Sequence, residues 1–114
     1  MSKPVVLAVD DDPQVLAAIR RDLRTKYAAD YQVVAAASGP EALATVNELH
    51  DRGDAVALFV VDQRMPEMTG TEFLVEAIKV FPQSRRLLLT AYADTRPGGA
   101  ARPRGIETAG PYDP

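Results

Sequence analysis

Acidic side chains and one threonine stand where apolar runs of the sequence end. Asp10, Asp11 and Asp12 follow the first run, Asp62 follows the third, and Thr90 follows the fourth. If the runs are parallel strands, these side chains share the carboxyl edge of one sheet, where ligand sites of open α/β sheets lie. Carboxylates gathered there repel one another unless a cation neutralises them, and oxygen ligands favour Mg²⁺. Asp62, alone at its strand end, is then the candidate nucleophile toward a phosphodonor, which would form an aspartyl phosphate.

Four short apolar runs would have to position these residues. They are Val5–Val9, Val33–Ala37, Ala57–Val61 and Leu87–Leu89. Unbroken runs of this length are typical of strands that are covered on both faces, as in a parallel sheet. Helical stripes lie between them, so the alternation predicts an open α/β sheet with right-handed crossovers.

Local signals mark the ends of three predicted helices. Asp12 is the N-cap of the first, with Pro13 in its first turn, which favours a capping role over a ligand role for this aspartate. Ser38 begins the second, because Glu41 three residues later has the spacing of a capping box. The third ends before Pro82.

Length and composition exclude several classes of protein. The chain has 114 residues, 46% hydrophobic and 25% charged, with a formal charge of −3. This suits one ordinary domain and supplies no basic field for nucleic acid, so no direct nucleic-acid partner is expected. No cysteine is present and no apolar run reaches membrane-spanning length, so we expect a cytoplasmic protein without a membrane partner.

The composition changes after Asp94. Residues 95–114 hold four of the nine prolines and four of the seven glycines, with few large apolar side chains. Such a segment buries too little apolar surface to offset the entropy of ordering it. We therefore predict one globular unit over residues 1–94 and a disordered tail over 95–114.

Three motifs together resemble the receiver domain of two-component response regulators. They are "VVLAVDDDPQVLAAI", "LFVVDQRMPEMTGTEFL" and "RRLLLTAYAD", and the match covers about residues 4–94. The resemblance implies a flavodoxin-like, doubly wound parallel α/β sheet of the CheY-like type. It also implies that the chain is a phosphoacceptor rather than an enzyme, with a histidine kinase or phosphotransfer protein upstream and an output domain or protein downstream.

The same resemblance implies roles for individual residues. Asp62 would be the phosphoacceptor, and Asp10 and Asp11 would hold Mg²⁺ together with Asp62 and the backbone carbonyl of Arg64. The Thr90 hydroxyl would turn toward the phosphoryl group, and the Ala91 amide would donate a hydrogen bond to it.

The sequence departs from the family after Asp94. A fourth helix, a fifth strand that ends in lysine and proline, and a fifth helix should follow, and none is recognisable. The only lysines are Lys3, Lys26 and Lys79, and none matches the family's phosphate-binding lysine. The receiver is therefore predicted to be incomplete at its C-terminal end, with apolar strand surface exposed and stability reduced.

Two other functions stay open beside the phosphorelay. The chain could be a protein-binding module that phosphorylation no longer switches, or a non-functional fragment of a truncated or frame-shifted receiver. A phosphatase with an aspartate nucleophile is disfavoured, because its second acid would fall on Arg64. Nucleotide binding has no support, since neither G-x-G-x-x-G nor a P-loop is present.

Overall fold

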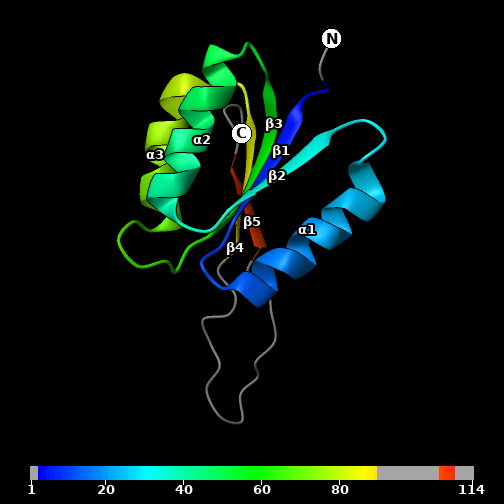
Figure 1. Ribbon diagram of the computed structural model, residues 1–114. Helices are drawn as coiled ribbons and strands as arrows, with labels where there is room; N and C mark the ends of the chain where they lie inside the picture. The colour runs from blue at the N-terminus through cyan, green and yellow to red at the C-terminus, as the bar shows by residue number, and fades with distance from the viewer. Residues whose placement is uncertain (1–2, 90–105, 110–114) are drawn as a thin grey trace.

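The computed structural model describes residues 3–89 and 106–109, which form five strands and three helices (Figure 1). In chain order these are β1 (Val5–Val9), α1 (Pro13–Tyr27), β2 (Gln32–Ala36), α2 (Gly39–Asp51), β3 (Val56–Asp62), α3 (Gly70–Val80), β4 (Arg85–Leu89) and β5 (Ile106–Ala109). The strand order is β2-β1-β3-β4-β5, and the first four strands are parallel. This confirms the predicted flavodoxin-like, doubly wound sheet.

Caps fix where the helices begin, largely as the sequence indicates. The Asp12 carboxylate accepts hydrogen bonds from the amides of Gln14 (2.9 Å) and Val15 (3.2 Å), so it caps α1. The Ser38 hydroxyl accepts from the Glu41 amide and caps α2. Thr69 caps α3 with a full capping box, since the Glu72 carboxylate also accepts from the Thr69 amide. Each cap satisfies amides that the first helical turn leaves without a partner.

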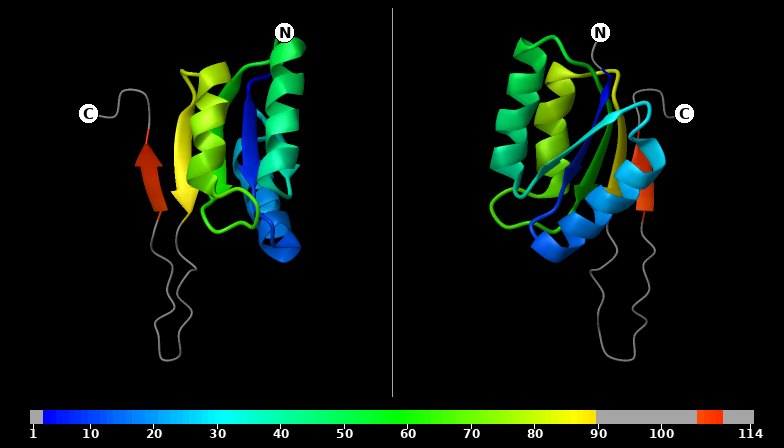
Figure 2. Two further views of the ribbon diagram at one scale, coloured as in Figure 1. Left: turned by 90° about the vertical axis from the view of Figure 1, so that its left-hand side faces the viewer. Right: turned by 45° about the vertical axis from the view of Figure 1, so that its right-hand side comes forward.

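The hydrophobic core lies between the sheet and the helices α2 and α3, which share one face of it (Figures 1 and 2). Phe59 of β3 and Phe73 of α3 are fully buried there and meet edge to face, with ring centroids 5.7 Å apart. Alternate residues of the strands point into this core, which is the period expected of β structure.

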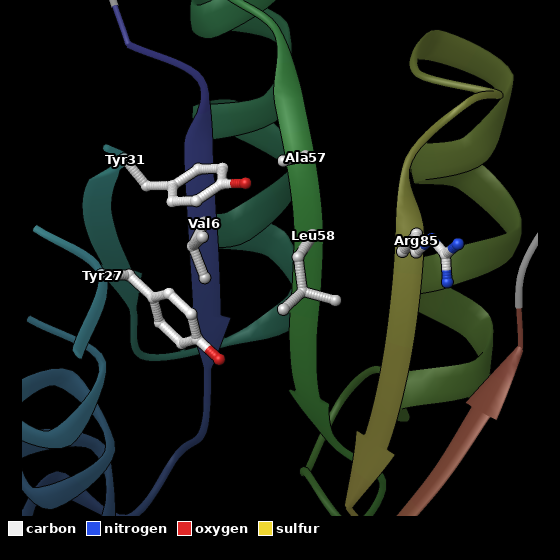
Figure 3. A pocket seen from close by; sticks show the side chains of 6 residues that line it. All are labelled: Val6, Tyr27, Tyr31, Ala57, Leu58 and Arg85. Atoms are coloured by element: carbon white, nitrogen blue, oxygen red, sulfur yellow. The ribbon is translucent and has the colours of Figure 1, made fainter. Parts of the chain in front are cut away.

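Helix α1 lies alone among the described helices on the opposite face (Figure 2). It packs on β2 and β1, and none of its residues is fully buried. A hollow of about 210 Å³ remains on this face beside the end of α1 (Figure 3). Its lining consists of Val6, Tyr27, Tyr31, Ala57, Leu58 and Arg85. The α1 face is thus packed less completely than the core face.

The composition of residues 95–114 predicts a disordered tail and gives no sign of strand β5. The structure pairs Ile106–Ala109 antiparallel with β4, with Ile106 opposite Leu89. The remainder of that tail lies outside the described residues. Among the described helices, none has the length and apolar character needed to cross a bilayer.

Candidate functional site

Three carboxylates meet at the carboxyl edge of the sheet. Asp10 and Asp11 follow β1, and Asp62 is the last residue of the neighbouring strand β3. The register that places Val9 beside Val61 brings these strand ends level with each other. One oxygen from each of the three carboxylates lies within 4.8 Å of the others. The structure therefore brings together the acidic residues that their strand-end positions had singled out.

Asp10 is buried and held by a hydrogen bond from the backbone. It is 2% exposed, and its Oδ1 accepts a hydrogen bond from the Asp12 amide at 2.9 Å. Burial raises the pKa of Asp10 above its ordinary value of 3.8; the Asp12 amide lowers it, and the charges of Asp11 and Asp12 raise it further. A cation beside Asp10 would thus offset both the cost of burying its charge and its repulsion from the neighbouring carboxylates.

The acidic cleft has a volume of about 400 Å³ and contains one cationic side chain among the described residues. Its lining consists of Asp10, Asp11, Asp12, Val15, Asp62 and Arg64. The Asp12 carboxylate is engaged as the α1 cap, which agrees with the capping role predicted for it. Asp10, Asp11 and Asp62 remain as the carboxylates that face a common point.

The loop after Asp62 is held by Gln63, a residue that no motif in the sequence marks for this role. The side-chain oxygen of Gln63 accepts hydrogen bonds from the backbone amide (2.8 Å) and the hydroxyl (2.9 Å) of Thr71. The backbone amide of Gln63 donates to the Leu89 carbonyl at 3.0 Å. A Cβ on Gly70 would lie 2.6 Å from the Asp62 carbonyl oxygen, so only glycine allows α3 to begin this close to β3. These contacts fix the backbone on which Asp62 and Arg64 stand.

Thr90 and Ala91, to which the family resemblance assigned contacts with a phosphoryl group, lie outside the described residues. Their roles stay predictions. Met65 of the loop after Asp62 is buried, in keeping with a loop that is anchored on the core.

The donor set fits a hard divalent cation. All three groups offer carboxylate oxygen, which Mg²⁺ prefers. Oxygens bound to one Mg²⁺ at 2.0–2.1 Å lie at most roughly 4.2 Å apart. The observed separation of up to 4.8 Å is close to this limit, so small side-chain rotations or a bridging water would complete the coordination.

A comparison with known protein families agrees with the geometry of the acidic cleft. Residues 6–108 match the family model described as the response regulator receiver domain. The chain belongs to this family. The match extends past Asp94, where the recognisable motifs of the receiver domain stop, and takes in most of β5.

Individual relatives show the same resemblance. The transcriptional regulatory protein GlrR of Escherichia coli (strain K12) is 35% identical over 101 residues, which are 89% of this chain and 21% of GlrR. The present chain spans about a fifth of the length of the first curated relatives that it matches.

Solved structures agree in fold. A CheY-like receiver domain protein from Methanospirillum hungatei JF-1 has 31% identity and a TM-score of 0.66 over 82% of this chain and 68% of its own. The response regulator TrrA from Thermotoga maritima, solved in complex with Mg²⁺ and BeF, has 28% identity and a TM-score of 0.63 over 79% and 71%.

Proposed function

We propose that this receiver domain is the phosphoacceptor of a two-component phosphorelay, with Asp62 as the residue that is phosphorylated. The observation that carries the proposal is the meeting of three carboxylates from two adjacent strand ends within 4.8 Å. Such a group of like charges is unfavourable by itself and becomes favourable around a divalent cation. The Mg²⁺–BeF complex of TrrA, a relative in fold and sequence, supports the same reading.

Asp10, Asp11 and Asp62 would hold Mg²⁺, and the backbone carbonyl of Arg64 completes the set that the family resemblance implies. When bound, the ion neutralises the carboxylates and the phosphoryl oxygens, so that an anionic nucleophile can approach an anionic donor. The α1 cap and the Gln63 contacts hold the two sides of the cleft in place for this approach.

The transfer itself uses one oxygen of Asp62. The donor is a phosphohistidine of a histidine kinase or phosphotransfer protein. A carboxylate oxygen of Asp62 attacks phosphorus, the phosphorus–nitrogen bond of the phosphohistidine breaks, and the imidazole leaves with the electron pair and takes up a proton. The product is an acyl phosphate on Asp62. The Thr90 hydroxyl and the Ala91 amide are the groups that we expect to contact it, and an output protein or domain would read the change.

In this role the chain is a stoichiometric acceptor and not an enzyme. Its location would be the cytoplasm, which the absence of cysteine from the sequence favours.

Acetyl phosphate with Mg²⁺ tests the proposal directly, because it replaces the kinase by a small phosphodonor. Intact-mass analysis should show the addition of one phosphoryl group, which a metal chelator or Asp62→Asn abolishes. Asp12→Asn is the matched control, since asparagine can keep the α1 cap while the same charge is lost from the cleft. A folded wild-type chain that stays unmodified, or an Asp62→Asn chain that is still modified, would overturn it. The former, if the chain still binds a kinase, would favour the protein-binding module.

A further inference from the structure

Phosphorylation of Asp62 would leave the acidic cleft with unbalanced negative charge. Asp10, Asp11 and Asp62 carry three negative charges when ionised, and Mg²⁺ returns two positive charges. An aspartyl phosphate carries close to two negative charges near neutral pH, as other phosphorylated side chains do. These three residues with the ion would therefore carry a net charge of about −2 after phosphorylation, and a second cation at the phosphoryl oxygens would stabilise them.

Arg64 is the one cationic side chain among the described residues that lines this cleft. Its guanidinium takes part in none of the ion pairs found between described residues. Two of the lysines contact groups elsewhere: Lys3 donates to the Ala28 carbonyl, and Lys79 pairs with Glu76. Arg64 thus lines the cleft as an exposed cation that makes no ion pair with another described residue.

The position of Arg64 also suits contact with a group on Asp62. The two residues are separated by Gln63 alone, and both line the same cleft although Asp62 is buried and Arg64 is exposed. Gln63 is tied to Thr71 and Leu89, so the backbone between them is fixed. A guanidinium offers two parallel N–H donors to phosphate oxygens, which makes it a stronger and more directional partner than an ammonium.

We propose that the Arg64 guanidinium binds the phosphoryl oxygens of phosphorylated Asp62 and stabilises the phosphorylated state. This proposal rests on the proposed function, and it adds a residue that binds the product of the transfer. Loss of a hydrogen bond between charged groups lowers affinity by about ten- to a hundredfold. We expect Arg64→Ala to weaken binding of a phosphoryl mimic by this factor.

Beryllium fluoride in the presence of saturating Mg²⁺ is the probe, with its affinity for the full chain measured by ¹⁹F NMR titration. Three variants are compared with wild type: Arg64→Ala, Arg64→Lys, and Arg20→Ala as a control that removes an exposed charge from α1. Arg64→Lys should recover part of the affinity, because it restores the charge without the paired donors. Arg20→Ala should bind as wild type does.

Mg²⁺ affinity without beryllium fluoride gives the second readout. Removal of a positive charge beside the carboxylates should leave Mg²⁺ binding unchanged or slightly tighter, while beryllium fluoride binding falls. General damage to the site would weaken both. Arg64→Ala with wild-type affinity for beryllium fluoride, or with equal losses for both ligands, would overturn the role of Arg64. Absence of beryllium fluoride binding by the wild-type chain, together with no phosphorylation by acetyl phosphate, would instead overturn the proposed function.

Discussion

Replacing Asp11 with asparagine should stabilise the metal-free protein and remove its response to Mg²⁺. Asp11 is exposed, and its carboxylate lies within 4.8 Å of oxygens of both Asp10 and Asp62. At that separation each pair of like charges costs ~0.9 kcal/mol in bulk water and ~3.5 kcal/mol at an effective dielectric constant of 20. Because Asp11 is exposed, the lower figure applies to it more closely. The two repulsions together then amount to about 2 kcal/mol.

Thermal unfolding with a chelator, and then with Mg²⁺, measures both effects. A gain of about 1 kcal/mol raises Tm by about 4–8 °C in a domain of this size. The metal-free Asp11→Asn chain should therefore unfold several degrees above wild type. The wild-type chain should gain ~2.7 kcal/mol when Mg²⁺ exceeds its Kd a hundredfold, and the variant should gain little. In 1 M salt the advantage of the metal-free variant should shrink, because salt screens exposed charges.

Asp30→Asn is the control for this experiment. It makes the same change of charge at an exposed turn after α1, away from the acidic cleft, and should alter neither value. If metal-free Asp11→Asn melts at or below the wild-type temperature, the carboxylates do not repel one another as argued. If it keeps the full Mg²⁺ response, Asp11 is not part of the metal site.

Three further predictions concern the parts of the fold that hold the site. Gly70→Ala should lower the free energy of unfolding by roughly 1–3 kcal/mol, read from the urea midpoint, because its Cβ would meet the Asp62 carbonyl at 2.6 Å. Gly53→Asn has open space around it and only the strain of φ +81°, which asparagine tolerates better than most residues, so it should lower the free energy by less. Asp12→Ala should cost about 1 kcal/mol through loss of the α1 cap, and Asp12→Asn should retain most of it. Between 3.8 and the raised pKa of Asp10, the folded chain holds a proton that the unfolded chain has lost. The stability of the metal-free wild type relative to Asp10→Asn should therefore fall as pH rises through this window, as Tm in a chelator against pH would show.

The sequence is sufficient for the acidic cleft and most of the fold because both depend on simple periodicities. Apolar runs predict β1 and β3. The residue that follows each run, Asp10 or Asp62, is polar because it lies at the carboxyl edge of the sheet, where the acidic cleft forms. The apolar run predicts β4 over Leu87–Leu89, whereas the strand begins at Arg85, which pairs with Leu58. Charged residues at a strand end carry no apolar signal, so the backbone pairing alone reveals them.

The loop between β3 and α3 could not be predicted in the same way. Its path includes Glu67 at φ 70°, a conformation that a glutamate seldom adopts and that no local motif announces. The contacts of Gln63 with Thr71 depend on that path, as does the close approach of Gly70 to Asp62. Strand β5 could not be predicted for another reason. It follows a segment rich in proline and glycine, and it is defined by its pairing with β4, a long-range contact.

The two sides of the acidic cleft are supported by parts of the fold that differ in packing. Asp62 belongs to β3, whose Phe59 and Val61 are fully buried under α2 and α3. Asp10 and Asp11 lead into the start of α1, a helix without a buried residue, and a hollow of about 210 Å³ lies beside its other end. An ion held by all three carboxylates would tie the start of the loosely packed helix to the well-packed strand. Local opening is easiest where few apolar contacts resist it, so metal binding in this chain would stabilise α1 as well as prepare Asp62 for phosphorylation.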